Sequence, residues 1–130
     1  MFMPCVTAGI IKPSDVVGYR SHQVYIRNSM HTPLSPDALR DAMNTLFSLL
    51  KEEPEAGVRA ILGHFLFTYI HPYMDGNGRV GRFLMNTMLA SGGYDWLIIP
   101  VERRSEYMEA LEKASVSRDI VPFVKFLSSI

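Results

Sequence analysis

Apolar residues recur at three- and four-residue steps between residues 36 and 51, which predicts an amphipathic helix. Ser35 is suited to cap its start, and Pro36 to occupy its first position. The apolar face comprises Leu39, Met43, Leu46, Leu49 and Leu50. A second helix is expected from about Glu55 to Ile70. Apolar residues cover most of its circumference, which indicates a central position in the fold.

Glycine and proline mark the ends of the remaining helices. Pro72 disfavours helical geometry at the residue before it, so the second helix should end at His71. A third helix is expected from near Asn77 to Gly92, because glycine is common just beyond a helix end. Two shorter helices should follow, one over residues 105–114 and one after Asp119.

Residues 18–28, which we call the flap segment, follow a different pattern. Val24 and Ile26 alternate there with Tyr25 and Arg27, which predicts a short strand or one arm of a hairpin. The predicted fold class is therefore mainly α, a helical bundle with a small β element near the N-terminus.

The length of 130 residues suits a single domain with one real core. We assign that domain to residues 18–130 and treat residues 1–17 as a separate N-terminal segment. The abrupt start at Met1, with no leading helix, suggests that this segment is truncated.

The net charge and the cysteine content limit which binding partners and which cellular compartment are expected. Thirteen basic and thirteen acidic residues cancel, which argues against indiscriminate binding to nucleic acid or to an anionic membrane. The lone cysteine, Cys5, has no partner for an internal disulfide, so a reducing, cytoplasmic location is expected. No stretch approaches the roughly 20 apolar residues that span a bilayer.

Residues 71–82, HPYMDGNGRVGR, place a glycine-broken loop between two predicted helices. The first N–H groups of the second helix lack internal partners and carry partial positive charge, which favours an anion. Gly76 and Gly78 are expected to adopt positive φ and expose their amides as a backbone nest. Asn77 between them tolerates the same geometry and can donate from its side chain.

Charged residues around this loop extend the prediction to a nucleotide. Arg79 and Arg82 stand three residues apart on the new helix and suit more than one phosphate group. Asp75 would repel such an anion unless a divalent cation, usually Mg²⁺, bridges them. His71 can take a proton from a nucleophile near neutral pH.

Simpler interpretations exist for each of these residues. A G-x-G sequence usually marks a turn, and a histidine after an apolar helix is commonly a hydrogen-bonded core residue. Arg79 could pair with Asp75, and Arg82 could be a solvated helix residue. Together these alternatives compete poorly, because each would be an independent accident within twelve residues. For His64, two turns before His71, a core position is favoured over a metal site.

HPYMDGNGRVGR resembles the Fic-domain signature H-P-F-x-D-G-N-G-R-x-x-R. Tyr73 is the one departure, since the family prefers phenylalanine there. The likeness extends over roughly residues 18 to 128 and includes the flap segment, which is similar to the Fic hairpin that aligns a target chain. The resemblance implies a Fic-type helical bundle that transfers AMP from ATP to a Ser, Thr or Tyr hydroxyl of a target protein.

The resemblance also implies a role for each residue of the signature. His71 would be the general base, and Asp75 would hold Mg²⁺ against the α- and β-phosphates. Backbone and side-chain donors of Gly76, Asn77 and Gly78 would cradle phosphate oxygens. Arg79 and Arg82 would neutralise the β- and γ-phosphates.

Other chemistry remains open at the same site. A related branch, Doc, resembles A-N-K at the middle of the signature and phosphorylates its target, whereas the sequence here keeps Gly76 to Arg79. De-AMPylation, or transfer of another nucleotide or phosphate group, is one alternative. A catalytically weak nucleotide-binding regulatory module is another.

Tyr107 and Asn86 are candidates for the adenine pocket. The alternative for Tyr107 is a partly buried helix tyrosine. Val24, Tyr25 and Ile26 of the flap segment could pair their backbone with an extended target chain. The alternative there is simply a small hairpin.

Many Fic proteins are restrained by a helix with a Ser/Thr-x-x-x-Glu-Gly/Asn pattern, whose glutamate pairs with the second motif arginine, here Arg82. Residues 1–130 contain no such pattern. Either an antitoxin-like partner supplies this helix, or it lies in a segment missing from this chain, or regulation is absent. We expect the chain as given to be uninhibited.

Overall fold

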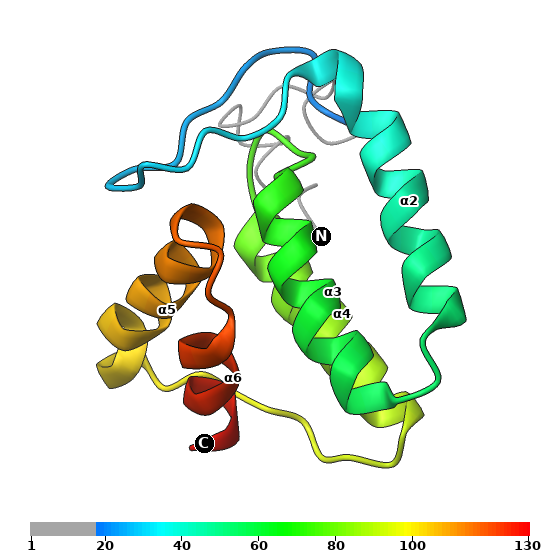
Figure 1. Ribbon diagram of the computed structural model, residues 1–130, viewed down its shortest axis with the longest axis vertical. Coiled ribbons are helices and arrows are strands. Elements are labelled where there is room, and N and C mark those ends of the chain that lie inside the picture. Colours follow the sequence, from blue (N-terminus) through cyan, green and yellow to red (C-terminus); the bar gives the residue numbers. More distant parts are fainter. Residues whose placement is uncertain (1–17) are drawn as a thin grey trace, which may run out of the picture.

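The computed structural model describes residues 18–130, and these residues are mainly helical (Figure 1). The elements in chain order are η2 (Pro36–Ala38), α2 (Leu39–Glu52), α3 (Ala56–Ile70), α4 (Asn77–Ser91), η3 (Val101–Arg103), α5 (Arg104–Val116) and α6 (Val121–Ser128), η denoting a 3₁₀ turn. The helical class predicted from the sequence is confirmed. The predicted N-terminal segment, residues 1–17, lies outside the described residues.

Helices α3 and α4 lie side by side at the centre, with α2 on one side and α5 and α6 on the other (Figure 1). Gly81 of α4 makes their close approach feasible. A Cβ atom at Gly81 would lie 3.0 Å from the Nδ1 atom of His64 and 3.1 Å from the Cγ2 atom of Thr68. A side chain at this position would therefore require the His64 and Thr68 side chains of α3 to shift by a few tenths of an ångström.

Two groups of buried side chains hold these helices together. One joins α2 to α3 through Leu39, Met43, Leu46, Leu50, Phe67 and Ile70. The other joins α3 and α4 to α5 and α6 through Ala60, Met85, Tyr107, Ala110, Phe123, Phe126 and Leu127. Met88 packs against both groups. Within residues 18–130, no helix combines the length and hydropathy needed to cross a membrane.

The ends of α3 and α4 follow the predicted proline and glycine positions. The N–H group of His71 donates to the Phe67 carbonyl at 2.9 Å, and the chain then leaves the helix before Pro72. Gly76, with φ of 79°, precedes α4, and Gly92 follows it. The loop between α3 and α4 therefore has its ends fixed by residue types that stop helices.

The predicted β-hairpin of the flap segment is wrong, since residues 18–130 contain no strand. The flap segment instead reverses direction in a turn at Arg27 and Asn28, closed by a 3.2 Å hydrogen bond from Ser29 N–H to the Ile26 carbonyl. Asn28 adopts a φ of 61°, which asparagine tolerates in turns. The returning arm contains Pro33, which has no N–H group to donate to a strand ladder.

Contacts with distant residues replace strand pairing around the turn. The carboxylate of Glu112 on α5 accepts hydrogen bonds from the Ser29 hydroxyl and from Met30 N–H, the latter at 2.8 Å. His31 Nε2 donates to the Tyr69 carbonyl at 2.8 Å, and its ring stacks on the Tyr69 ring. The chain after the turn is thus fastened to α3 and α5.

Candidate active site

His71 stands where α3 ends, in the left-handed conformation with φ of 55° and ψ of 60°. Its Nδ1 atom lies 3.2 Å from the Thr68 carbonyl. Because a carbonyl can only accept, Nδ1 carries the proton and donates, which leaves the lone pair on Nε2. The ring is therefore held in the tautomer that a general base requires at Nε2.

The surroundings of His71 favour its neutral form. Burial lowers the pKa of this imidazole below its usual value of 6.5, and the nearby Arg20 and His31 lower it further. The hydrogen bond to Thr68 acts in the opposite direction; it is a smaller influence than burial but a larger one than either charge. His71 is consequently neutral, and able to accept a proton, at physiological pH.

Asn77 at the start of α4 clamps the loop from within. Its Nδ2 atom donates to the Tyr73 carbonyl at 2.8 Å, and its Oδ1 atom accepts from the Tyr73 N–H group at 2.9 Å. The side chain is 2% exposed. The structure thus engages this side chain in bracing the loop, while the backbone N–H of Asn77 lies in the first turn of α4.

Replacing Asn77 by alanine is expected to destabilise the fold by about 1–3 kcal/mol, because both polar backbone groups of Tyr73 lose their buried partner. Urea unfolding, followed by circular dichroism, measures this change. The matched control is Asn44→Ala, since Asn44 is exposed on α2. Equal unfolding midpoints for the two variants would contradict the clamp.

The glycines of the loop differ from the prediction in one respect. Gly76 has the expected positive φ, whereas Gly78 lies within α4 in helical geometry. A Cβ atom at residue 78 would lie 3.2 Å from the Nη1 atom of Arg82, so glycine here gives room to the guanidinium. Instead of a nest built by two left-handed glycines, the loop has one left-handed glycine, Gly76, followed directly by the N-terminus of α4. A helix N-terminus also favours an anion.

The charged residues predicted to serve the site share one end of the α3–α4 pair. Arg79 and Arg82 lie in the first turns of α4, and Asp75 is exposed in the loop before it. Arg82 lies near enough to the buried His64 and Tyr107 for its charge to lower the pKa of both. Among residues 18–130, no group of three His, Cys, Asp or Glu side chains gathers in a metal-binding arrangement.

Tyr107 is a core residue. It is 5% exposed, its hydroxyl lies 2.6 Å from Nε2 of His64, and its ring packs near Phe123 and Phe126. Burial lowers the pKa of His64 to about 4, so the pair is neutral. The structure favours the buried-tyrosine alternative over contact with adenine, and His64 occupies the core as expected.

Asn86 is also engaged elsewhere. Its Nδ2 atom donates to the Leu97 carbonyl at 3.1 Å, and its Oδ1 atom accepts from Leu97 N–H at 2.7 Å. This side chain ties the extended segment after α4 back to that helix. We therefore leave Tyr107 and Asn86 out of the candidate nucleotide site.

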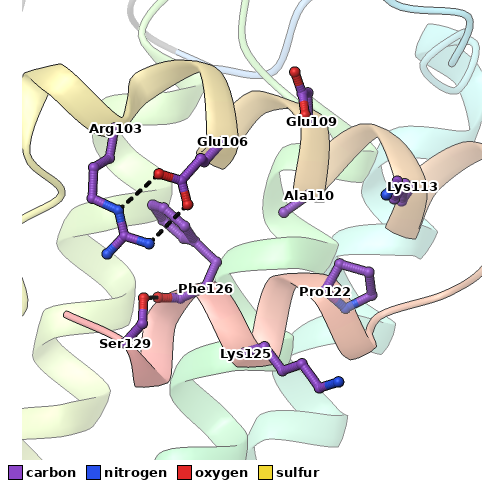
Figure 2. A pocket seen from close by; sticks show the side chains of 9 residues that line it. All are labelled: Arg103, Glu106, Glu109, Ala110, Lys113, Pro122, Lys125, Phe126 and Ser129. Carbon is purple, nitrogen blue, oxygen red and sulfur yellow. Dashed lines mark hydrogen bonds and ion pairs between the residues drawn. The ribbon is translucent and has the colours of Figure 1, made fainter.

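Hollows on the surface of residues 18–130 include two that lie outside the α3–α4 loop. Figure 2 shows one of about 340 Å³ between α5 and α6, where Arg103 pairs with Glu106 and stacks over the Phe126 ring. Its lining includes no residue of the loop. A second, mainly apolar hollow of about 250 Å³ lies between α3 and α5, with Tyr69 and Ser115 in its wall. Arg118 also lines it, but most of its wall is apolar and suits an uncharged group.

Sequence reasoning missed Arg20 of the flap segment. This arginine is 4% exposed, and its Nε atom donates to the His71 carbonyl at 2.7 Å. Nothing in the local pattern distinguishes it from exposed arginines such as Arg27. The hydrogen bonds that bury it come from residues about 50 positions along the chain.

These features define a class of protein: a helical protein in which one loop of the central helix pair carries a neutral histidine and leads into a helix N-terminus that favours an anion. The sequence profile described as the Fic/DOC family matches residues 7–89. The chain belongs to this family.

Individual relatives agree with the family match. The protein adenylyltransferase Fic of Nematostella vectensis is 39% identical over 124 residues, which is 92% of this chain and 28% of that protein. Its counterpart in Drosophila melanogaster is 37% identical, over 92% of this chain and 25% of that protein. The chain thus spans about a quarter of the length of the curated relatives it matches.

Solved structures give the same fold. Fic-1 of C. elegans, residues 134 to 508, aligns with a TM-score of 0.79 at 29% identity, over 98% of this chain and 38% of that one. A Fic-domain-containing signalling protein from Bacteroides thetaiotaomicron aligns with a TM-score of 0.76 at 30% identity, over 85% of this chain and 49% of that one.

Proposed function

We propose that this chain transfers AMP from ATP to a hydroxyl side chain of a target protein and releases pyrophosphate. The observation that carries the proposal is the state of His71. It is neutral, its Nδ1 proton is engaged by Thr68, and its Nε2 lone pair remains for a hydroxyl proton. The relatives named protein adenylyltransferase Fic support the same activity.

The proposed reaction moves one proton and exchanges one bond at the α-phosphorus of ATP. Nε2 of His71 takes the proton of a Ser, Thr or Tyr hydroxyl as its oxygen attacks the α-phosphorus of ATP. The bond between the α-phosphorus and the oxygen bridging to the β-phosphate breaks, and that oxygen leaves with pyrophosphate. Holding the base and the phosphate chain on one loop supplies the orientation that such a transfer needs.

The start of α4 would bind the phosphates. The N–H groups of the first turn and the left-handed Gly76 favour anionic oxygens, and Arg79 and Arg82 add two positive charges. Asp75 would hold Mg²⁺, which neutralises phosphate charge when bound. A single exposed carboxylate fits this ion, because Mg²⁺ commonly binds through one or two carboxylates and the substrate phosphates. The apolar hollow near Tyr69 is our candidate for the site that binds the adenine ring of ATP.

Incubation of the purified chain with Mg²⁺ and ATP labelled at the α-phosphate is expected to label the chain itself or a protein in added lysate. Mass spectrometry should find adducts of one AMP. ATP labelled at the γ-phosphate distinguishes phosphate transfer, and competition by other nucleoside triphosphates tests the nucleotide. Calorimetry that detects ATP binding without any turnover would instead favour the regulatory-module alternative.

The rate of labelling is expected to fall as the pH drops below a midpoint that lies under 6.5 and to be flat above it. His71 must be neutral to act as a base, and burial lowers its pKa, so the active form persists into mild acid. Initial rates at ATP concentrations well below KM, measured from acid pH to neutrality, give the midpoint for the free protein. A midpoint above 6.5 would contradict the proposed environment of His71.

We further propose that the target chain docks on the flap segment. Tyr25 is 77% exposed there, between Val24 and Ile26, and all three residues lie outside any helix or turn. The fastening of Ser29 and Met30 to Glu112 supports a fixed docking position.

We also propose that residues 18–130 act as one Fic domain, since Met88 joins both groups of buried side chains. A glutamate-bearing helix from an antitoxin-like partner, or from a further part of a longer protein, would restrain it by pairing with Arg82. Neither nucleic acid nor a membrane is a partner in this proposal. The single cysteine supports a reducing compartment such as the cytoplasm.

A further inference from the structure

Arg20 is buried, and its side chain donates its hydrogen bonds to main-chain carbonyls. The Nε atom donates to His71 at 2.7 Å, Nη1 donates to His22 at 3.0 Å, and Nη2 donates to Leu34 and, at 3.4 Å, to Ile70. A buried guanidinium is costly unless its N–H groups are hydrogen-bonded, so this arrangement needs a dense set of acceptors. The end of α3 supplies part of that set, because the last carbonyls of a helix lack internal partners.

The contacts of Arg20 fall on both sides of the imidazole-bearing residue. Its side chain binds the carbonyls of Ile70 and His71, and its own N–H group donates to the Pro72 carbonyl at 2.8 Å. These are three consecutive residues. One arginine thereby fixes the backbone immediately before, at and after the point where α3 ends.

His71 needs such support because its backbone is strained. His71 has a φ of 55°, and a non-glycine residue in this left-handed region persists where its surroundings hold it there. The side chain of His71 has the Thr68 hydrogen bond, but that bond orients the ring only if the Cα–Cβ direction is already set. The carbonyl contacts of Arg20 set that direction.

We propose that Arg20 is the positioning residue for His71, holding its backbone in the left-handed conformation so that Nδ1 reaches Thr68 and Nε2 is presented to the reacting hydroxyl. The inference rests on the proposed function in assigning His71 as the base. Arg20 does not touch the reacting groups in this scheme. Its contacts with the carbonyls of His22 and Leu34 also join both arms of the chain around the flap turn to the end of α3.

The test uses Arg20→Lys, which keeps the charge but loses the planar fork, and Arg20→Met, which loses both. Arg27→Met is the matched control, because Arg27 is exposed in the same segment. The first measurement is the ¹⁵N chemical shifts of the His71 ring across pH, which report its tautomer and its pKa without requiring activity. The second is kcat and KM for ATP in the labelling reaction.

In the parent and in Arg27→Met, we expect the Nδ1–H tautomer of His71 and a pKa below 6.5. In Arg20→Lys, the ¹⁵N shifts should move towards a mixture of the two tautomers. The kcat should fall on the order of 10²-fold, with KM for ATP nearly unchanged, because a small misplacement of a reacting group has that effect. In Arg20→Met, the pKa of His71 should also rise relative to the parent, because the arginine charge that lowers it is gone.

Parent-like ¹⁵N shifts of His71 in Arg20→Lys would overturn the positioning role, whether or not labelling falls. A parallel change in KM for ATP and kcat would also overturn it, because the effect would then extend to the phosphate site. If Arg20→Met fails to fold, Arg20→Lys decides, compared at a temperature where circular dichroism shows it folded. If the parent does not label but its ring shifts respond to Arg20→Lys, the proposed activity fails while the positioning inference holds.

Discussion

Replacing His71 by alanine is expected to reduce AMP transfer on the order of 10²- to 10⁴-fold, the usual contribution of a general base. The proton of the attacking hydroxyl then has no acceptor at Nε2, while the clamp between Asn77 and Tyr73 leaves the phosphate site in place. The measurement is incorporation of label from α-labelled ATP under single-turnover conditions. ATP affinity, measured by calorimetry, should change little.

His22→Ala is the control for this experiment, because the His22 side chain is exposed and only its carbonyl binds Arg20. It should label as the parent does. Circular dichroism spectra of both variants establish that the fold is retained. Labelling by His71→Ala at the parent rate would show that His71 is not the base.

Replacing Phe123 by alanine is expected to lower the free energy of unfolding by about 3–5 kcal/mol, the range for a fully buried phenylalanine. Phe123 is 0% exposed, and its ring stacks on His64 with centroids 5.6 Å apart and lies near Tyr107. Its loss leaves a cavity between α6 and the central helices. The midpoint and slope of urea unfolding give the change.

Phe47→Ala provides the comparison, since Phe47 is 50% exposed on α2 and belongs to neither group of buried side chains. Its replacement should cost much less than that of Phe123. Similar losses in the two variants would mean that α6 is not packed on the central helices as described. If Phe123→Ala stays folded but no longer binds ATP, the packing around Phe123 and His64 would be needed to hold Arg82 in position for the phosphates.

The helices and the candidate site could be predicted because their signals are local. Apolar spacing located α2 and α3, Pro72 marked where α3 ends, and Gly76 marked the break before α4. The residues that form the loop are consecutive, so their chemistry could be interpreted together. The central place of α3 followed from the apolar residues around its whole circumference.

The flap segment could not be predicted in the same way. Alternation of Val24 to Arg27 is typical of a strand, yet a strand needs a partner with N–H groups, and the returning arm holds Pro33. The chain directly after the flap segment is held to Glu112 through Ser29 and Met30, and these hydrogen bonds join residues more than 80 positions apart. No local pattern contains that information, and the same holds for the buried contacts of Arg20.

Buried amides show a second limit of prediction from the sequence. Asn77 and Asn86 each use both ends of the side-chain amide on the backbone of one other residue, Tyr73 and Leu97 respectively. Donor and acceptor atoms that bind a nucleotide are the same atoms that bind a peptide group. The residue type alone therefore cannot distinguish an asparagine that braces the backbone from one that contacts a ligand.

The glycine at residue 81 has a consequence for how this chain can vary. His71 follows the end of one central helix and Arg82 lies in the second turn of the other, so the spacing between these helices also sets the distance between the proposed proton acceptor and a proposed phosphate contact. Even a methyl group at residue 81 would push against His64 and Thr68. A substitution remote from both reactants would then misalign them. Natural variants of this chain should therefore retain glycine at residue 81 as strictly as they retain His71.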